Sequence, residues 1–172
     1  MVREVIDAER VRRRIGEMAV QVAADYAGTE PVFVGVLNGA AQFMLEVIGR
    51  LPAVLQERLL YDFVQVSSYQ GRANRDQVSL HRECGVEVRD QDVLVFEGIV
   101  DTGRTVERVL ETLGARGPRS LRVCTFLDKP SRRRCPVPVD YCGFSIPDLF
   151  VVGFGLDQDQ RYRALRYIGV VE

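Results

Sequence analysis

Apolar runs with the length of β-strands alternate along this chain with segments of helical periodicity, and few folds accommodate that alternation. Five runs fit strands: residues 31–36, 59–69, 92–98, 121–127 and 148–155. Apolar residues three and four positions apart predict helices over residues 7–27, 37–50 and 104–114. Alternating strands and helices are typical of parallel sheets, whose buried strands are apolar throughout. The sequence therefore predicts an α/β fold with a mostly parallel central sheet flanked by helices.

The composition fits one domain over residues 1–172 and argues against several classes of protein. Hydrophobic residues make up 47% and charged residues 27%, as in globular proteins. A formal net charge of −1 does not favour binding to nucleic acids or to a membrane surface. No apolar run approaches the roughly 20 residues of a membrane-spanning helix, and the charged start contains no apolar signal core.

Cysteine and histidine usage makes several chemistries improbable. Cys84, Cys124, Cys135 and Cys142 show neither a CxxC pair nor the spacing of zinc ligands. This pattern favours reduced, buried thiols in a cytoplasmic protein. The single histidine, His81, is expected at the surface, which argues against a metallohydrolase or a Ser-His hydrolase.

Four loops are the candidate ligand-binding positions. In open parallel sheets, ligands bind outside the carboxyl ends of the strands. That rule selects the loops after Val36, Phe96, Leu127 and Gly155. Each of these loops begins with or contains polar residues, so we expect one shared site.

The segment DTGRT, residues 101–105, predicts a phosphate-binding loop before a helix. Gly103 permits a backbone conformation with inward-pointing amides, and the helix start supplies free N–H groups and a positive dipole end. The threonine hydroxyls and Arg104 add donors and charge. An ordinary strand-to-helix loop with a threonine cap is the alternative. The P-loop and GxGxxG patterns are both absent.

Two carboxylates, Glu97 and Asp101, bracket this loop. They would repel a phosphate unless they bind ribose hydroxyls, hold magnesium or transfer a proton. Any of these tasks would suit a sugar-phosphate substrate.

At this point the chain resembles a known family. VLVFEGIVDTGRT (93–105) resembles the phosphoribosyl-pyrophosphate motif of the type I phosphoribosyltransferases. Four further segments resemble the hypoxanthine-guanine branch in the family's order: GVLNGA (35–40), SSY (67–69), LDKPSRR (127–133) and FSIPDLFVVGFGLDQDQRYR (144–163). The resemblance covers nearly the whole chain, and it implies the type I fold with a small hood and a mobile loop.

The resemblance implies roles around the sugar and its phosphates. Asp101 would transfer a proton at N7 of the purine, and Glu97 would reach the ribose hydroxyls or their magnesium ion. The 5′-phosphate would be bound by Thr102, Gly103, Arg104 and Thr105. The pyrophosphate loop would consist of Leu37, Asn38 and Gly39, with a cis peptide between the first two.

It also implies roles around the base and the metal. Lys129 would donate to the 6-oxo group, and of the 23 Lys and Arg residues it is the only lysine. Phe150 would stack on the base, and the Val151 backbone would contact its far edge. Asp157 would ligate a second magnesium ion, and Arg163 would contact pyrophosphate. The mobile loop would carry Ser68 and Tyr69. Without the resemblance, Phe150 would be assigned to the core and residues 157–163 to a solvated segment.

The implied function is purine salvage. The enzyme would transfer the 5-phosphoribosyl group from phosphoribosyl pyrophosphate to N9 of hypoxanthine or guanine, with Mg²⁺ as cofactor, as a cytoplasmic homodimer or homotetramer. One alternative is a catalytically weak or inactive paralogue that senses a nucleotide or binds RNA through the basic runs 12–14 and 131–134. Another is an enzyme that prefers xanthine, because a lysine and a phenylalanine accept every 6-oxopurine.

Gly98 departs from the family's pattern, which usually has a second acid at this position. A glycine has no side chain for a ribose hydroxyl or a metal-bound water. Weaker sugar binding, a changed substrate preference, lost catalysis and a sequence variant are the readings that remain open. An active enzyme with weakened sugar binding predicts that Gly98→Asp raises kcat/KM for the phosphoribosyl donor.

Overall fold

The structure is a computed structural model that describes residues 1–68 and 78–172. Along the chain its elements are β1 (Val2–Ile6), α1 (Ala8–Asp25), β2 (Val32–Leu37), α2 (Ala41–Ile48), α3 (Ala53–Gln56), β3 (Leu60–Ser68), β4 (Val78–Arg82), β5 (Asp92–Val100), α4 (Arg104–Gly114), β6 (Ser120–Asp128), the 3₁₀ turn η1 (Pro130–Arg132), β7 (Tyr141–Ser145) and β8 (Ile168–Val171).

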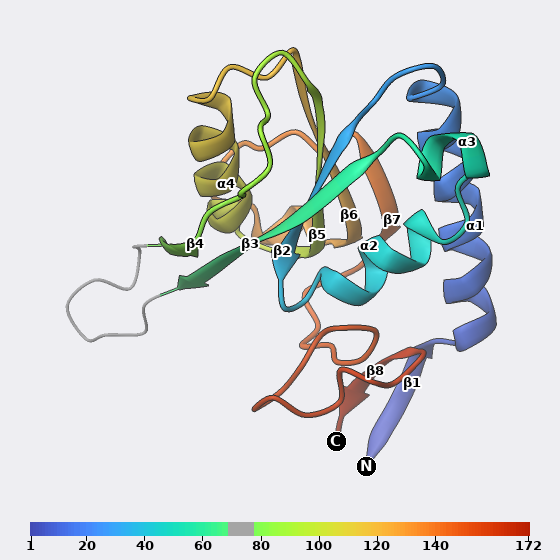
Figure 1. The fold of residues 1–172 in the computed structure, drawn as a ribbon. Helices are drawn as coiled ribbons and strands as arrows, with labels where there is room; N and C mark the ends of the chain where they lie inside the picture. Colours follow the sequence, from blue (N-terminus) through green and yellow to red (C-terminus); the bar gives the residue numbers. More distant parts are fainter. Residues whose placement is uncertain (69–77) are drawn as a thin grey trace.

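The main sheet has six strands in the order β4-β3-β2-β5-β6-β7. Only β3 and β4 pair antiparallel, and the other neighbours are parallel. Helices α1 and α2 lie on one side of the sheet and α4 on the other (Figure 1). The predicted α/β fold with a mostly parallel, helix-flanked sheet is confirmed.

Aromatic packing fixes the centre of this sheet. The ring centroids of Phe33 on β2 and Phe96 on β5 lie 5.3 Å apart, and Phe43 on α2 lies 5.5 Å from Phe96 and 5.3 Å from Phe126 on β6. All four side chains are fully buried. Such ring pairs add to the burial energy, so three central strands and α2 form a rigid base for the loops at their carboxyl ends.

Helices α1 and α4 begin where local sequence signals place them, whereas the helix predicted over residues 37–50 is shorter, since α2 spans Ala41–Ile48 and Leu37 still belongs to β2. Asp7 caps α1, since its side chain accepts a hydrogen bond from the Arg10 amide at 2.8 Å. Helix α4 spans the predicted residues 104–114, and it follows Gly103, whose φ of 91° is left-handed. Both helices bury the apolar stripe that the periodicity indicated.

The predicted strand over residues 148–155 is wrong. This apolar run forms an irregular coil with isolated bridges, because Gly153, Phe154 and Gly155 have φ values of 101°, 47° and 93°. The strand that pairs in parallel with β6 is β7, residues 141–145, which the sequence analysis assigned to no element.

Three further strands were not predicted. Strand β4 extends the main sheet beside β3, whereas β1 and β8 pair antiparallel in a separate two-stranded sheet. Figure 1 shows this small sheet, with both chain termini, beyond the carboxyl end of β2. Together with the coil after β7 it forms the hood. Tyr69 and the predicted mobile loop over 70–77 lie outside the described residues, and Ser68 is the last residue of β3.

All four cysteines are unpaired, as predicted, but only Cys84 and Cys124 are buried, and Cys135 and Cys142 are partly exposed. Among the described residues, no helix combines the length and apolar character that crossing a bilayer requires.

Candidate active site

The loop after β2, the carboxyl-terminal half of β5 and the coil after β7 meet at the carboxyl edge of the sheet. A Cβ atom placed on Gly98 would lie 2.7 Å from the carbonyl oxygen of Gly39, and one on Gly155 would lie closer still to the same oxygen. Leu156 also approaches both Gly39 and Gly98. Three of the predicted segments are therefore in direct contact.

The loop after β2 has the expected backbone. The peptide between Leu37 and Asn38 is cis, as the resemblance implied. Asn38 is exposed and Gly39 is partly exposed, so the loop can be reached from solvent.

The loop over residues 101–105 has the features of an anion-binding nest. Gly103 takes a left-handed conformation, and α4 begins directly after it. Within the described part of the chain, the amides of Thr102, Gly103 and Thr105 have no hydrogen-bond partner. The Thr102 carbonyl accepts from the Arg134 and Cys135 amides at 2.9 and 3.0 Å, which holds the loop in place. Free amides at a helix start are donors for an anion.

Asp101 is held by a neighbouring arginine. Arg132 Nε donates to Asp101 Oδ1 at 2.7 Å, and Arg132 Nη1 donates to Asp148 Oδ2 at 3.2 Å. The guanidinium therefore bridges the loop after β5 and the coil that precedes Phe150. Sequence analysis gave Arg132 and Asp148 no individual role. Arg132 lies in the segment LDKPSRR (127–133) and Asp148 in the segment 144–163, both of which carried the resemblance, but the arginines 132–134 were also considered as part of a basic surface.

Lys129 is buried, with 5% of its surface exposed. Its amide donates to the Val100 carbonyl at 3.0 Å, and Nζ lies 3.9 Å from Asp148 Oδ1. A buried ammonium with one distant carboxylate retains donors for a ligand. Val151, the residue directly after the predicted stacking position Phe150, is also buried.

Phe150 is 63% exposed, although large aromatic side chains are usually buried. Assignment to the core, the alternative for this residue, is wrong. The exposed ring offers a flat apolar surface two residues after Asp148, whose carboxylate lies near Lys129.

Glu97 is almost fully buried, and its Oε1 accepts a hydrogen bond from the Gly98 amide at 2.8 Å. Burial raises the pKa of this carboxyl to about 8, and the amides of Gly98 and Ile99 oppose the rise. At neutral pH the side chain is therefore mostly protonated.

Asp157 and Arg163 form an ion pair of 2.8 Å. The other oxygen of Asp157 accepts from the Gln160 amide at 2.9 Å, and Arg163 Nη1 donates to the Gly155 carbonyl at 2.7 Å. The two predicted residues thus lie together and fix the coil beside Gly39.

No group of three or more metal-ligating side chains occurs among residues 1–68 and 78–172. Glu97 and Asp157 therefore do not form an all-protein metal cage. Mg²⁺ does not require such a cage, because it commonly takes one or two carboxylates and completes its octahedron with phosphate oxygens and water.

The geometry of Gly98 opposes the expectation for Gly98→Asp. Backbone atoms of Gly39 fill the space where a side chain at position 98 would begin. Any larger residue must push the loop after β2 away from the sheet, so Gly98 permits a close approach between two backbones.

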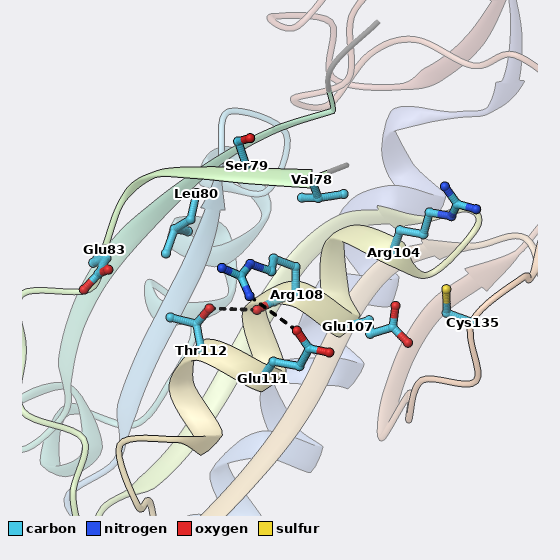
Figure 2. Close-up of a pocket in the computed structure, with 10 residues that line it drawn as sticks. All are labelled: Val78, Ser79, Leu80, Glu83, Arg104, Glu107, Arg108, Glu111, Thr112 and Cys135. Carbon is cyan, nitrogen blue, oxygen red and sulfur yellow. Dashed lines mark hydrogen bonds and ion pairs between the residues drawn. The ribbon is translucent and has the colours of Figure 1, made fainter. Parts of the chain in front are cut away.

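A cavity of about 790 Å³ lies elsewhere, between β4 and α4. Figure 2 shows its described lining residues, of which Arg104 alone belongs to the residues predicted for the site. Among these described residues the acids Glu83, Glu107 and Glu111 outnumber the bases Arg104 and Arg108. Because that balance disfavours a phosphate, we do not assign the substrate to this cavity.

Comparison with known proteins gives consistent matches. The model of the phosphoribosyl transferase domain family matches residues 1–159. The hypoxanthine phosphoribosyltransferase of Salmonella typhimurium is 42% identical over 170 residues, which cover 97% of this chain and 93% of that protein.

Solved structures agree over the same length. A hypoxanthine-guanine phosphoribosyltransferase from Bacillus anthracis superposes with a TM-score of 0.92 at 32% identity and covers 100% of both chains. The hypoxanthine phosphoribosyltransferase of Trypanosoma cruzi, in complex with the product IMP, has a TM-score of 0.88 at 34% identity, over 98% of this chain and 93% of that one.

Proposed function

The chain belongs to the phosphoribosyltransferase family, and from this membership we propose that it salvages 6-oxopurines. It transfers the 5-phosphoribosyl group from phosphoribosyl pyrophosphate to N9 of hypoxanthine or guanine, which yields IMP or GMP and pyrophosphate. The names of its relatives and the IMP complex of one of them support this substrate class.

The observation that carries the proposal is the chain's only lysine, which is buried with its Nζ 3.9 Å from Asp148, two residues before the exposed ring of Phe150. Lys129 Nζ has donors and no acceptor, so it suits the 6-oxo group and would face the amino group of adenine poorly. Phe150 offers the ring on which the base stacks, and the Val151 backbone contacts the far edge of the base.

Asp101 serves as the proton-transfer group. As N9 of the purine bonds to C1 of the ribose, the bond from C1 to pyrophosphate breaks, and the proton on N7 passes to the Asp101 carboxylate. The partly exposed position of Asp101 beside the nest of residues 102–105 supports this role. The nest binds the 5′-phosphate through its free amides, its threonine hydroxyls and Arg104.

Pyrophosphate is bound by residues 37–39 and Arg163. Mg²⁺, when bound, neutralises the charge that develops on the leaving group. Asp157 and Glu97 are the residues that would hold it. Glu97 must lose its proton and leave the Gly98 amide to do so or to reach the ribose hydroxyls.

We also propose that the chain forms a homodimer or homotetramer and acts in the cytoplasm. The four unpaired cysteines are consistent with a reducing compartment. An RNA-binding regulator is not supported, because Arg132 and Arg133 of the run 131–134 bind carboxylates within the chain.

The test is an absorbance assay with phosphoribosyl pyrophosphate and Mg²⁺ that compares hypoxanthine, guanine, xanthine and adenine. We expect turnover of hypoxanthine and guanine and none of adenine, with Lys129→Met lowering kcat/KM for both substrates. Turnover of adenine alone would refute the role of Lys129, and no turnover with any base would favour the regulatory paralogue.

A further inference from the structure

Arg132 connects two carboxylates at the edge of the proposed purine site. Its Nε lies 2.7 Å from Asp101 Oδ1, and its Nη1 lies 3.2 Å from Asp148 Oδ2. Asp148 Oδ1 in turn lies 3.9 Å from Lys129 Nζ. A continuous chain of alternating charges therefore runs from Asp101 to Lys129.

This series of charged side chains links Asp101 to Lys129, the two residues proposed to contact neighbouring atoms of the base. The inference rests on the proposed function, in which Asp101 faces N7 and Lys129 faces the 6-oxo group. Both atoms lie on the same edge of a purine. The distance between a proton-transfer group and a carbonyl donor must match that edge, and a fixed linkage between them would set it.

Arg132 is suited to orient Asp101 rather than to react. A guanidinium has only donors and stays protonated in proteins, so it cannot exchange a proton with N7. It occupies Oδ1, and Oδ2 of Asp101 has no hydrogen-bond partner among the described residues. One oxygen is thus fixed and the other is open to a ligand, as in catalytic groups held by an orienting partner.

The position of Arg132 is itself fixed by the backbone. Its amide donates to the Lys129 carbonyl at 3.1 Å within η1, and the Lys129 amide donates to Val100 on β5 at 3.0 Å. The side chains of Arg132 and Asp148 are 41% and 55% exposed, and an isolated ion pair so exposed would contribute little to stability. Their effect should therefore appear in catalysis and not in folding.

We propose that Arg132 and Asp148 are positioning residues that hold the Asp101 carboxylate and the Lys129 ammonium at the spacing required by N7 and the 6-oxo group of a purine.

The first test compares Arg132→Gln with Arg134→Gln, which removes the same charge from an exposed side chain that has no partner among the described residues. We expect Arg132→Gln to lower kcat with hypoxanthine about tenfold, as loss of one charge-assisted hydrogen bond to a catalytic group does. KM for phosphoribosyl pyrophosphate and the midpoint of thermal unfolding should stay unchanged. Arg132→Lys should recover part of kcat, and Arg134→Gln should match the parent.

The second test asks whether Arg132 acts through Asp101. In an Asp101→Asn background, Arg132→Gln should cause no further loss of kcat, because the group that it orients is gone. Asp148→Asn should raise KM for hypoxanthine several-fold. Additive losses, or an Arg132→Gln variant as active as the parent while Asp101→Asn is slow, would overturn the positioning role alone. An Asp101→Asn variant with the parent's kcat would overturn both this inference and the proposed role of Asp101.

Discussion

At the scale of single residues, the burial of Glu97 opposes the charge that its proposed role requires. It lies at the carboxyl end of β5, where a sugar ligand would need a charged oxygen, yet burial keeps it protonated. The pKa of the Glu97 carboxyl is about 8 in the folded state and near 4.5 in the unfolded chain. Stability that this residue contributes is therefore present below about pH 4.5 and is lost as the pH rises to about 8.

Glu97→Gln should remove this loss. The amide oxygen can still accept from Gly98, and a neutral side chain has no ionisation to suppress. We expect the variant to gain a few kcal/mol over the parent between pH 5 and pH 9, which urea unfolding at several pH values measures. Parallel stability curves for the two proteins would show that Glu97 is already ionised in the folded chain.

Gly98 gives a second prediction at this scale. Because Gly39 fills the space beside it, Gly98→Asp should move the loop after β2 and raise KM for phosphoribosyl pyrophosphate about tenfold or more. Gly16→Ala, which would meet no atom within 4 Å, is the control for a glycine substitution. Steady-state kinetics of both variants measure this KM. A gain in kcat/KM for Gly98→Asp would contradict the prediction and indicate that the missing acid weakens sugar binding.

At the scale of elements, the start of α4 carries the donors that we propose for the 5′-phosphate. Its first residue follows a left-handed glycine, and a Cβ at Gly103 would lie 2.7 Å from the Cys135 carbonyl oxygen. Gly103→Ala should therefore distort the nest and the segment packed on it. We expect KM for phosphoribosyl pyrophosphate to rise at least tenfold and stability to fall by about 1–3 kcal/mol. Isothermal titration with the donor and urea unfolding test the two effects, and unchanged donor affinity would place the 5′-phosphate elsewhere.

Elements defined by local signals were predictable from the sequence, and those defined by distant pairing were not. Helix α4 and the nest before it depend on Gly103 and on a periodic stripe within eleven residues. Strands β1 and β8 exist because Val2 pairs with Val171, which no local pattern encodes. Residues 148–155 are apolar enough for a strand, but the backbone conformation at three consecutive residues decides otherwise.

The same distinction applies to the site. The resemblance placed Lys129 and Phe150 by motif, and the structure gives them a burial and an exposure that suit those roles. It could not assign the contact of Arg132 with Asp101, because the side chains come from loops after different strands and meet only through the packing of η1.

At the scale of the whole molecule, β7 is the edge strand that leads into the coil proposed to bind the base, and α1 contacts β7 from another part of the fold. Arg14 donates to the carbonyls of Cys142 and Gly143 at 2.6 and 2.9 Å, with its side chain only 26% exposed. The sequence analysis considered the basic run 12–14 as part of an RNA-binding surface. One of its members instead satisfies two carbonyls of β7.

Arg14→Met should therefore destabilise the fold by about 2 kcal/mol, since two hydrogen bonds from a charged donor are lost. Arg13→Met is the matched control, because Arg13 is exposed and has no partner among the described residues. We expect urea unfolding to separate the two variants and KM for hypoxanthine to rise only in Arg14→Met, since β7 ends just before the coil that carries Asp148 and Phe150. Equal stability of the two variants would mean that α1 does not hold this edge, and that the loops of the site depend on the central strands alone.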